Sequence, residues 1–267
     1  MNDKQISDTW KQGGPYEQYV GRWSRKIAPK FLTWLHCATG LRWLDVGCGT
    51  GALSGAVVDN CSPMLVAGME PSNGFLKVAK EKLADRVVLY QGTATHIPLA
   101  ASTVDVIVSG LVLNFVIDQH AAILEMARVS SSGGIIGAYV WDYAEKMEMM
   151  RHFWDAVVAL HPNDAAIDEG DRFPLCNPEA LMKLFADAGL REIDVTAIDI
   201  QTNFRSFEDY WQPFLGGQGS APSYVMALDG NERARLREHL RARVPMQADG
   251  SISLVARAWA VRATVEK

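Results

Sequence analysis

Short apolar runs alternate with amphipathic segments along the first half of this chain. Runs such as "LRWLDVG" and "MLVAGME" have the length of buried strands, and the segment after the second run begins with Ser72 as a plausible helix N-cap. Strands that alternate with helices in this way are typical of a parallel sheet covered on both faces. The pattern predicts strands at 41–47, 64–70, 86–91, 103–110 and 133–141 and helices at 51–61, 72–84 and 119–130.

The second half of the chain is patterned more loosely. Helices are expected at 145–160 and 177–190, followed by strands at 191–200 and 253–265. Since crossovers between parallel strands are right-handed, these elements give an α/β fold with a doubly wound, mostly parallel seven-stranded sheet.

The domain organisation follows from the spacing of these elements. The segment between the last two strands is too long for an ordinary connection and is expected to be a helical insertion that serves as a lid. Residues 16–36 mix aromatic and basic side chains at roughly helical spacing. We expect a single domain over 1–267, with a helical cap at 1–38, a core at 39–200 and 251–267, and the insertion at 201–250.

Composition narrows the function classes only slightly. The chain has 267 residues, 48% of them hydrophobic and 21% charged, as in ordinary globular proteins, and its net charge of −5 argues against a nucleic-acid partner. No apolar run is long enough to span a membrane and the N-terminus lacks a signal-peptide core, so a cytoplasmic location is expected. The chain has four cysteines, at positions 37, 48, 61 and 176. Because they show neither C-x-x-C nor zinc spacing, no bound metal is expected.

Three glycines follow the first predicted strand in "LDVGCGTGA", at positions 47, 49 and 51. Such a cluster indicates a tight turn or a ligand that approaches the backbone closely. A P-loop is excluded because no lysine follows the glycines. The dinucleotide fingerprint is matched through Gly47, Gly49 and Ala52, with Glu70 at the end of the next strand, so an NAD(P)-dependent oxidoreductase is one interpretation.

The wider sequence favours another interpretation. "LDVGCGTG", "GMEPSNGFL", "YQGTATHIPLAASTVDVIVSGLVLNF" and "ARVSSSGG" follow one another between about residues 40 and 141. Together they resemble the class I S-adenosylmethionine-dependent methyltransferases, in particular the small-molecule branch that includes quinone-biosynthesis enzymes. The resemblance implies a Rossmann-like fold, S-adenosyl-L-methionine as cofactor, and methyl transfer to an oxygen, nitrogen or carbon atom of a small, partly apolar acceptor.

The resemblance also implies a set of cofactor contacts. Asp45 would hold the amino-acid end of the cofactor, Glu70 would accept both ribose hydroxyls, and Phe75 would lie against adenine. Asp45 also has a structural interpretation, as a capping acceptor for the amides of the loop. Thr93 stands where the family commonly has an aspartate that binds the adenine amine, and nearby His96 is read either as part of the adenine pocket or as loop packing. The full set of expected contacts is Tyr19, Arg22, Asp45, Gly47, Gly49, Gly51, Glu70, Pro71, Phe75, Thr93, Ala94, Ser109 and Leu111.

The N-terminal segment "YEQYVGRW" has two open interpretations. Tyr16, Tyr19 and Trp23 could close over the cofactor, with Arg22 pairing its carboxylate. The same spacing also suits a surface helix with a snorkelling arginine.

Methyl transfer from a sulfonium is an in-line displacement, in which the enzyme supplies proximity and orientation. A general base is needed only where the acceptor must lose a proton. Asp105 lies before the ligand-facing end of its strand and is expected to be structural. None of the candidates stands out as a general base. They lie near the carboxyl ends of the fourth and fifth predicted strands and are Asn114, Asp142, Tyr143 and His152.

Three further features have a plain structural interpretation beside a functional one. The acid-rich stretch 161–171 is expected to be a solvated loop rather than a metal site. The helix 231–243 carries five arginines, which an RNA-modifying methyltransferase could use, but its acids and leucines favour an ordinary solvated helix. A group of large apolar residues is either core or an acceptor pocket: Trp141, Tyr143, Met149, Met150, Phe153, Trp154, Tyr210, Trp211 and Phe214.

Overall fold

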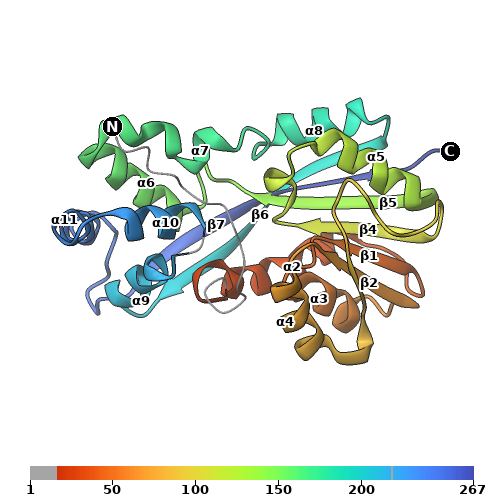
Figure 1. The fold of residues 1–267 in the computed structure, drawn as a ribbon, viewed down its shortest axis with the longest axis horizontal. Helices are drawn as coiled ribbons and strands as arrows, with labels where there is room; N and C mark the ends of the chain where they lie inside the picture. The colour runs from red at the N-terminus through yellow and green to blue at the C-terminus, as the bar shows by residue number, and fades with distance from the viewer. Residues whose placement is uncertain (1–16, 218) are drawn as a thin grey trace. The chain divides into compact units, whose positions relative to one another are not determined.

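The computed structural model describes residues 17–217 and 219–267, and this part of the chain contains a seven-stranded sheet. The strands lie in the order β3-β2-β1-β4-β5-β7-β6 (Figure 1). The chain therefore starts in the middle of the sheet, winds outward to β3 and returns to continue from β4, as the doubly wound prediction requires. The strands are β1 Arg42–Val46, β2 Leu65–Glu70, β3 Val88–Gln91, β4 Val104–Gly110, β5 Ser130–Trp141, β6 Arg191–Phe204 and β7 Ile252–Thr264.

Most of the sheet is parallel. Strand β1 pairs in parallel with β2 and β4, β2 with β3, and β4 with β5. Strand β7 runs antiparallel to β5, since the Gly133 amide donates to Val265 (2.8 Å) and the Asp142 amide donates to Arg257 (3.0 Å) at the opposite end of the pair. The mostly parallel seven-stranded sheet expected from the sequence is confirmed.

Helices cover both faces of the parallel strands. Figure 1 shows α3 and α4 on one side of these strands and α5 and α8 on the other. Several helices have an N-cap side chain that accepts a hydrogen bond from a backbone amide of the first turn. At the start of α4 the Ser72 hydroxyl accepts from the Phe75 amide, which confirms Ser72 as the predicted N-cap. The α-helices are α2 Arg22–Leu35, α3 Ala52–Asn60, α4 Asn73–Leu83, α5 Gln119–Val129, α6 Glu148–Leu160, α7 Glu169–Arg172, α8 Pro178–Asp187, α9 Phe207–Trp211, α10 Ser220–Ala227 and α11 Gly230–Arg241.

Short helical turns connect these elements. A π-helical turn, η1 Glu17–Gly21, precedes α2, so the helical spacing noted over 16–36 becomes a regular α-helix only from Arg22 onward. Strand β6 continues four residues beyond the predicted end at 200, because buried Thr202 and Phe204 alternate with exposed Gln201 and Asn203. The 3-10 turns are η2 Ala84–Arg86, η3 Leu113–Phe115, η4 Pro162–Ile167 and η5 Gln212–Leu215.

Contacts between Cα atoms divide the chain into two units. Unit 1 comprises the described residues up to Trp23 together with Trp141–Pro174 and Asp199–Arg257. Unit 2 comprises Ser24–Val140, Leu175–Ile198 and Ala258–Lys267. The expected layout of cap, core and lid within a single domain stays a prediction.

An ion pair at the amino ends of β1 and β4 stabilises unit 2. The Arg42 guanidinium donates to both carboxylate oxygens of Asp105, at 2.9 and 2.6 Å, and the Arg42 amide donates to the same carboxylate. These bonds lower the pKa of Asp105 to about 2. Asp105 is thus a structural residue that joins two neighbouring strands, as expected.

Replacing Asp105 by Asn is expected to lower the melting temperature by about 2–4 °C at pH 7, a modest loss because solvent screens this pair. The native pKa of Asp105 lies below its unfolded value, so its contribution is present above about pH 4 and is lost as the pH falls through about 2. Thermal melts of both proteins between about pH 7 and about pH 2 measure this. A difference that stays constant over this range would contradict the proposed role of the ion pair.

The core of unit 1 is aromatic. The rings of Phe153 and Phe214 stack with centroids 4.7 Å apart, and Trp154 and Tyr224 pack around them. The Tyr210 hydroxyl donates to the Met149 carbonyl oxygen at 2.8 Å. All nine large apolar residues considered for an acceptor pocket are at most 5% exposed, and this mutual packing favours the core interpretation.

The expectation of a solvated acidic loop at 161–171 is wrong for two of its residues. Asp168 and Glu169 are both buried. Asp168 accepts bidentate hydrogen bonds from the Arg151 guanidinium, and Glu169 accepts from the Trp154 indole N–H at 2.9 Å. Within unit 1 these carboxylates are structural partners of α6.

Two kinds of feature are absent from the described residues. None of the helices described has the length and apolar character that crossing a membrane requires. Over residues 17–217 and 219–267, no group of three or more His, Cys, Asp or Glu side chains is arranged to hold a metal ion.

Candidate functional site

The glycine loop follows directly from the carboxyl end of β1. Gly47, Gly49 and Gly51 have φ angles of +77°, +54° and +85°, a region that side-chain-bearing residues rarely adopt. The Gly47 and Cys48 amides both donate to the Met69 carbonyl oxygen, at 2.8 and 3.0 Å, which ties the loop to β2. A Cβ atom on Gly47 would lie 2.6 Å from both methyl groups of Val112. Both the backbone conformation and the packing therefore require glycine at position 47.

Glu70 joins the end of β2 to this loop. Its Oε2 atom accepts from the Gly49 amide at 3.1 Å and its Oε1 atom from the Ser72 amide at 2.9 Å. The side chain is 7% exposed, and burial raises its pKa although the two amides act in the opposite direction. A carboxylate has about four acceptor positions, so Glu70 can still accept hydroxyl donors from a ligand.

Asp45 is buried, and only one of its two carboxylate oxygens has a hydrogen-bond partner among the described residues. Its Oδ2 atom accepts from the Ser54 hydroxyl at 2.6 Å, whereas Oδ1 has no hydrogen-bond partner among the described residues. Burial raises the pKa of Asp45 to about 7, against the lowering effect of Ser54. An unpartnered buried oxygen of this kind is rare in proteins and suits a cationic or hydrogen-bond-donating ligand group.

The end of β4 adds a second set of residues beside the loop. The Ser109 hydroxyl donates to the Val46 carbonyl oxygen at 2.9 Å, and Leu111 adopts φ +64° while its amide donates to the Tyr139 carbonyl oxygen at 2.7 Å. Asn114 lies on η3 and is 7% exposed. Neither atom of its amide group has a partner within the part of the chain that the structure describes.

The residues expected around adenine follow β2 and β3. Phe75 is 7% exposed on α4, whereas Pro71 and Thr93 are exposed. The Thr93 hydroxyl lies 3.4 Å from the hydroxyl of Thr95, and the Gly92 amide donates to the Glu70 carbonyl oxygen at 3.4 Å. Ala94 is half-buried in the same loop. The adenine-binding role of these residues stays a prediction.

Two expected cofactor contacts, Tyr19 and Arg22, belong to unit 1, whereas the glycine loop belongs to unit 2. Arg22 donates to Asp209 Oδ1 at 3.0 Å, and its guanidinium carbon lies 4.3 Å from the ring centroid of Trp23 and 4.7 Å from that of Phe204. The Tyr19 ring meets Phe214 edge-on at 5.6 Å. Their closure over the cofactor stays a prediction, and Tyr16 lies outside the described residues.

The catalytic candidates are divided between the units. Asn114 belongs to unit 2, and Asp142, Tyr143 and His152 belong to unit 1. Burial raises the pKa of Asp142, whose Oδ1 accepts from the Glu145 amide at 3.1 Å. Burial lowers the pKa of His152, which favours its neutral form. Their catalytic roles stay predictions.

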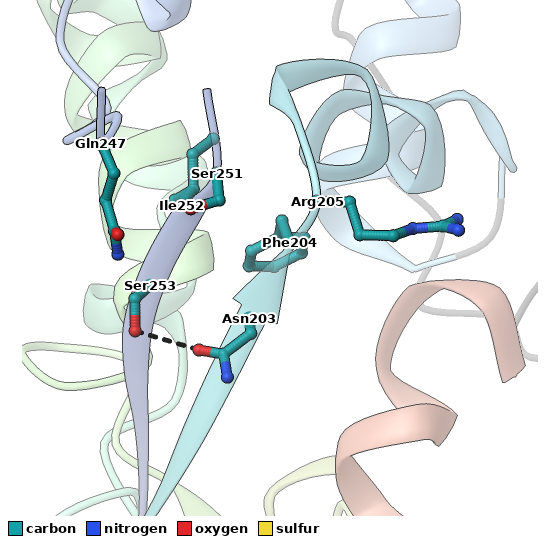
Figure 2. Close-up of a pocket in the computed structure, with 7 residues that line it drawn as sticks. All are labelled: Asn203, Phe204, Arg205, Gln247, Ser251, Ile252 and Ser253. Atoms are coloured by element: carbon teal, nitrogen blue, oxygen red, sulfur yellow. Dashed lines mark hydrogen bonds between the residues drawn. The ribbon is translucent and has the colours of Figure 1, made fainter. Parts of the chain in front are cut away.

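A cleft of about 330 Å³ lies within unit 1, where β6 ends and β7 begins (Figure 2). Figure 2 shows Ser253 on β7 facing Asn203 on β6, and the Ser253 hydroxyl donates to Asn203 Oδ1 at 2.9 Å. None of the residues expected to bind the cofactor or to act in catalysis lines this cleft. The cleft is lined by Asn203, Phe204, Arg205, Gln247, Ser251, Ile252 and Ser253.

The segment that contains the glycine loop, Glu70 and Asn114 matches a known family. Residues 44–138 match the model of the methyltransferase domain family. These residues form a methyltransferase domain. The resemblance inferred from the sequence is confirmed, and the NAD(P)-dependent oxidoreductase is not favoured.

Two curated relatives of the methyltransferase domain come from bacteria. The ubiquinone/menaquinone biosynthesis C-methyltransferase UbiE of Campylobacter jejuni is 28% identical over 129 residues, which cover 46% of this chain and 54% of that protein. The uncharacterized methyltransferase Rv3342 of Mycobacterium tuberculosis is 36% identical over 129 residues, which cover 48% of this chain and 49% of that protein. The chain thus spans about half the length of the curated relatives that it matches.

The fold itself extends beyond the methyltransferase domain segment. Phosphoethanolamine N-methyltransferase 2 of Haemonchus contortus, solved with S-adenosylhomocysteine and phosphomonomethylethanolamine, superposes with a TM-score of 0.55 at 16% identity. The match covers 92% of this chain and 53% of that one. This likeness confirms the Rossmann-like methyltransferase fold.

Sequence reasoning missed three contacts that shape the site. It did not place Val112 against Gly47, it did not pair Ser54 with Asp45, and it gave Glu70 no role in holding the loop. For Ser54 a signal was present, since this polar residue lies in the first turn of the helix that follows the loop. The contact of Val112 with Gly47 depends on how β4 is placed beside β1, for which the sequence has no local signal.

Proposed function

We propose that this chain is an S-adenosylmethionine-dependent methyltransferase that acts on a small, partly apolar acceptor. The observation that carries the proposal is the link from Glu70 to the Gly49 amide, which places a buried carboxylate against a glycine loop. This geometry suits a ligand with a ribose and an amino-acid chain. When bound, S-adenosylmethionine supplies an electrophilic methyl group on a sulfonium.

The residues around the loop fit this cofactor. The bare backbone of the glycine loop leaves room for the methionine and ribose parts to lie against it. Glu70 can accept the two ribose hydroxyls in charge-assisted hydrogen bonds. The free Oδ1 atom of Asp45 suits the ammonium group of the amino-acid end. The protein thereby binds and orients the donor, and proximity is the main contribution required for the displacement.

A small acceptor is supported by two observations. The relative from Campylobacter jejuni is named for C-methylation in quinone biosynthesis, and quinones are small, partly apolar molecules. Two of the α11 arginines have partners within unit 1. Arg237 pairs with Glu208 and Glu238. Arg233 donates to the carbonyl oxygens of Val225 and Leu228. These two engaged arginines add little to an open basic surface of the kind that binding to RNA requires.

We also propose a cytoplasmic location. All four cysteines are free thiols, and Cys48 and Cys176 are buried. Unpaired thiols are typical of proteins kept in a reducing compartment.

Isothermal titration with S-adenosylhomocysteine and with NAD tests the cofactor. Saturable binding of S-adenosylhomocysteine is expected, and saturation by NAD alone would overturn the proposal. Transfer of a labelled methyl group from S-adenosylmethionine to a panel of phenols and quinols then tests the acceptor class. Bulk transfer RNA serves as the comparison acceptor, and its exclusive methylation would reassign the substrate.

The affinity for S-adenosylhomocysteine is expected to depend on pH through Asp45. The pKa of this carboxyl is about 7 in the free protein, and a bound ammonium group would favour the carboxylate and lower it. The affinity should therefore be constant above about pH 8 and fall by up to about tenfold for each pH unit below about 7. Titrations between about pH 5.5 and about pH 8.5 measure this dependence.

Asp45→Asn is the control for this prediction, because the amide keeps an acceptor for Ser54 and does not titrate in this range. Its affinity should vary little with pH and match the weak binding of the unaltered protein at low pH. If both proteins lost affinity equally on acidification, another group would be responsible.

A further inference from the structure

The segment after β4 contains a single polar side chain in an otherwise apolar run. Residues 111–117 read "LVLNFVI", and Asn114 is the polar residue. Val112, Phe115 and Val116 are half-buried, and Ile117 is fully exposed. Asn114 lies among them with 7% of its surface exposed.

Both ends of the Asn114 amide lack a partner. Neither Nδ2 nor Oδ1 has a hydrogen bond within the described residues, and both atoms are inaccessible to solvent. An amide buried without hydrogen bonds destabilises a protein relative to an apolar side chain of similar shape, such as leucine. Folding alone therefore does not account for asparagine at this position, whereas a bound ligand would complete its hydrogen bonds.

The position of the segment within unit 2 indicates which ligand this is. Val112 lies against Gly47, and the Leu111 amide is held by the Tyr139 carbonyl oxygen. The segment therefore lies beside the glycine loop, at the carboxyl ends of β1, β4 and β5. In a doubly wound sheet this edge is where ligands bind.

We propose that Asn114 binds a hydroxyl or carbonyl group of the methyl acceptor, whose apolar part lies on the surrounding side chains of 111–117. This inference rests on the proposed function. An amide both donates and accepts, so it matches a hydroxyl that offers a proton and a lone pair. Since an amide does not titrate in the physiological range, Asn114 orients the acceptor and does not remove its proton.

The chemistry of the segment thus narrows the acceptor class. The acceptor carries a hydroxyl or carbonyl group on an aromatic or aliphatic framework. It does not need a charged group where it meets Asn114. Phenols, quinols and hydroxylated polycyclic compounds meet this description. A purely ionic acceptor would find neither a countercharge on Asn114 nor polar neighbours in the apolar run 111–117.

The test uses a pair of probes that differ by one hydroxyl, 1-naphthol and naphthalene. Each is titrated by fluorescence into full-length protein saturated with S-adenosylhomocysteine. For the unaltered protein, 1-naphthol is expected to bind about tenfold more tightly than naphthalene, as a pair of neutral hydrogen bonds allows. In Asn114→Leu this preference should fall to about twofold or less, while naphthalene binds at least as well as before.

Two further variants keep the test decisive. Asn114→Gln keeps the amide on a longer side chain, and it should keep part of the preference for 1-naphthol over naphthalene. It also provides a measurement if Asn114→Leu fails to fold. Asn73→Ala alters an exposed asparagine on α4 and should leave the preference unchanged. Circular dichroism melts establish that each variant is folded.

The outcomes separate this inference from the proposed function. If Asn114→Leu weakens S-adenosylhomocysteine instead of reducing the hydroxyl preference, Asn114 serves the cofactor and the inference is wrong. An unaltered protein with no preference for 1-naphthol would overturn the inference while leaving the methyltransferase proposal intact. If the unaltered protein does not bind S-adenosylhomocysteine at all, the proposed function itself fails.

Discussion

Replacing Glu70 by Ala is expected to weaken the binding of S-adenosylhomocysteine between about tenfold and about a hundredfold, which corresponds to about 1.4–2.8 kcal/mol. The ribose hydroxyls would lose the acceptor that we propose for them, and the Gly49 and Ser72 amides would lose the acceptor that holds them in place. Hydrogen bonds to a charged group contribute more than neutral ones, so the loss should be large. Isothermal titration at pH 8 measures it.

Two variants show whether this loss is specific. Glu81→Ala removes an exposed acid from α4 and should bind as the unaltered protein does. Glu70→Gln keeps the shape and one carbonyl acceptor and should fall between the unaltered protein and Glu70→Ala. An unchanged dissociation constant for Glu70→Ala would remove this residue from the ribose role.

Replacing Gly47 by Ala is expected to reduce the affinity for S-adenosylhomocysteine more than a hundredfold, or about 2.8 kcal/mol. The new Cβ would lie 2.6 Å from both Val112 methyl groups, so the loop or the segment after β4 must move. Such a movement would displace the backbone on which the ligand is expected to lie. Titration calorimetry together with thermal melts measures the effects on binding and on stability.

Gly40→Ala is the matched control for this substitution. Gly40 has nearly the same φ angle as Gly47, +74° against +77°, but a Cβ atom there would meet nothing within 4 Å. Gly40→Ala should therefore lower the free energy of unfolding by about 1 kcal/mol, because alanine is strained in a left-handed backbone conformation. Its affinity for S-adenosylhomocysteine should not change. Equal effects at both positions would mean that strain, and not contact with Val112, accounts for the change.

Much of the fold could be predicted because its determinants are local. The apolar runs of β1, β2 and β4 and the cap at Ser72 each lie within a few residues of sequence, and the structure places these elements within two residues of the predicted bounds. The glycine loop and Glu70 were found for the same reason, since both occur at the ends of strands that the pattern already located.

The remaining features depend on residues far apart in the sequence. Burial of Asp168 and Glu169 follows from Arg151 and Trp154 on α6, and a stretch rich in acids has no local sign that such partners exist. The unpartnered amide of Asn114 likewise depends on what the fold places around it. The grouping of 141–174 with 199–257 in unit 1 is set by tertiary packing, which periodicity does not encode.

The hydrogen bonds from Gly49 and Ser72 to Glu70 have a consequence for the kinetics of binding. They fix the loop conformation while the protein folds, so little conformational entropy is left to be lost when a ligand arrives. Association can then proceed as a single encounter with a rigid surface, without a slow rearrangement beforehand. The side chain that we propose to bind the ribose is therefore also expected to speed the capture of the ligand.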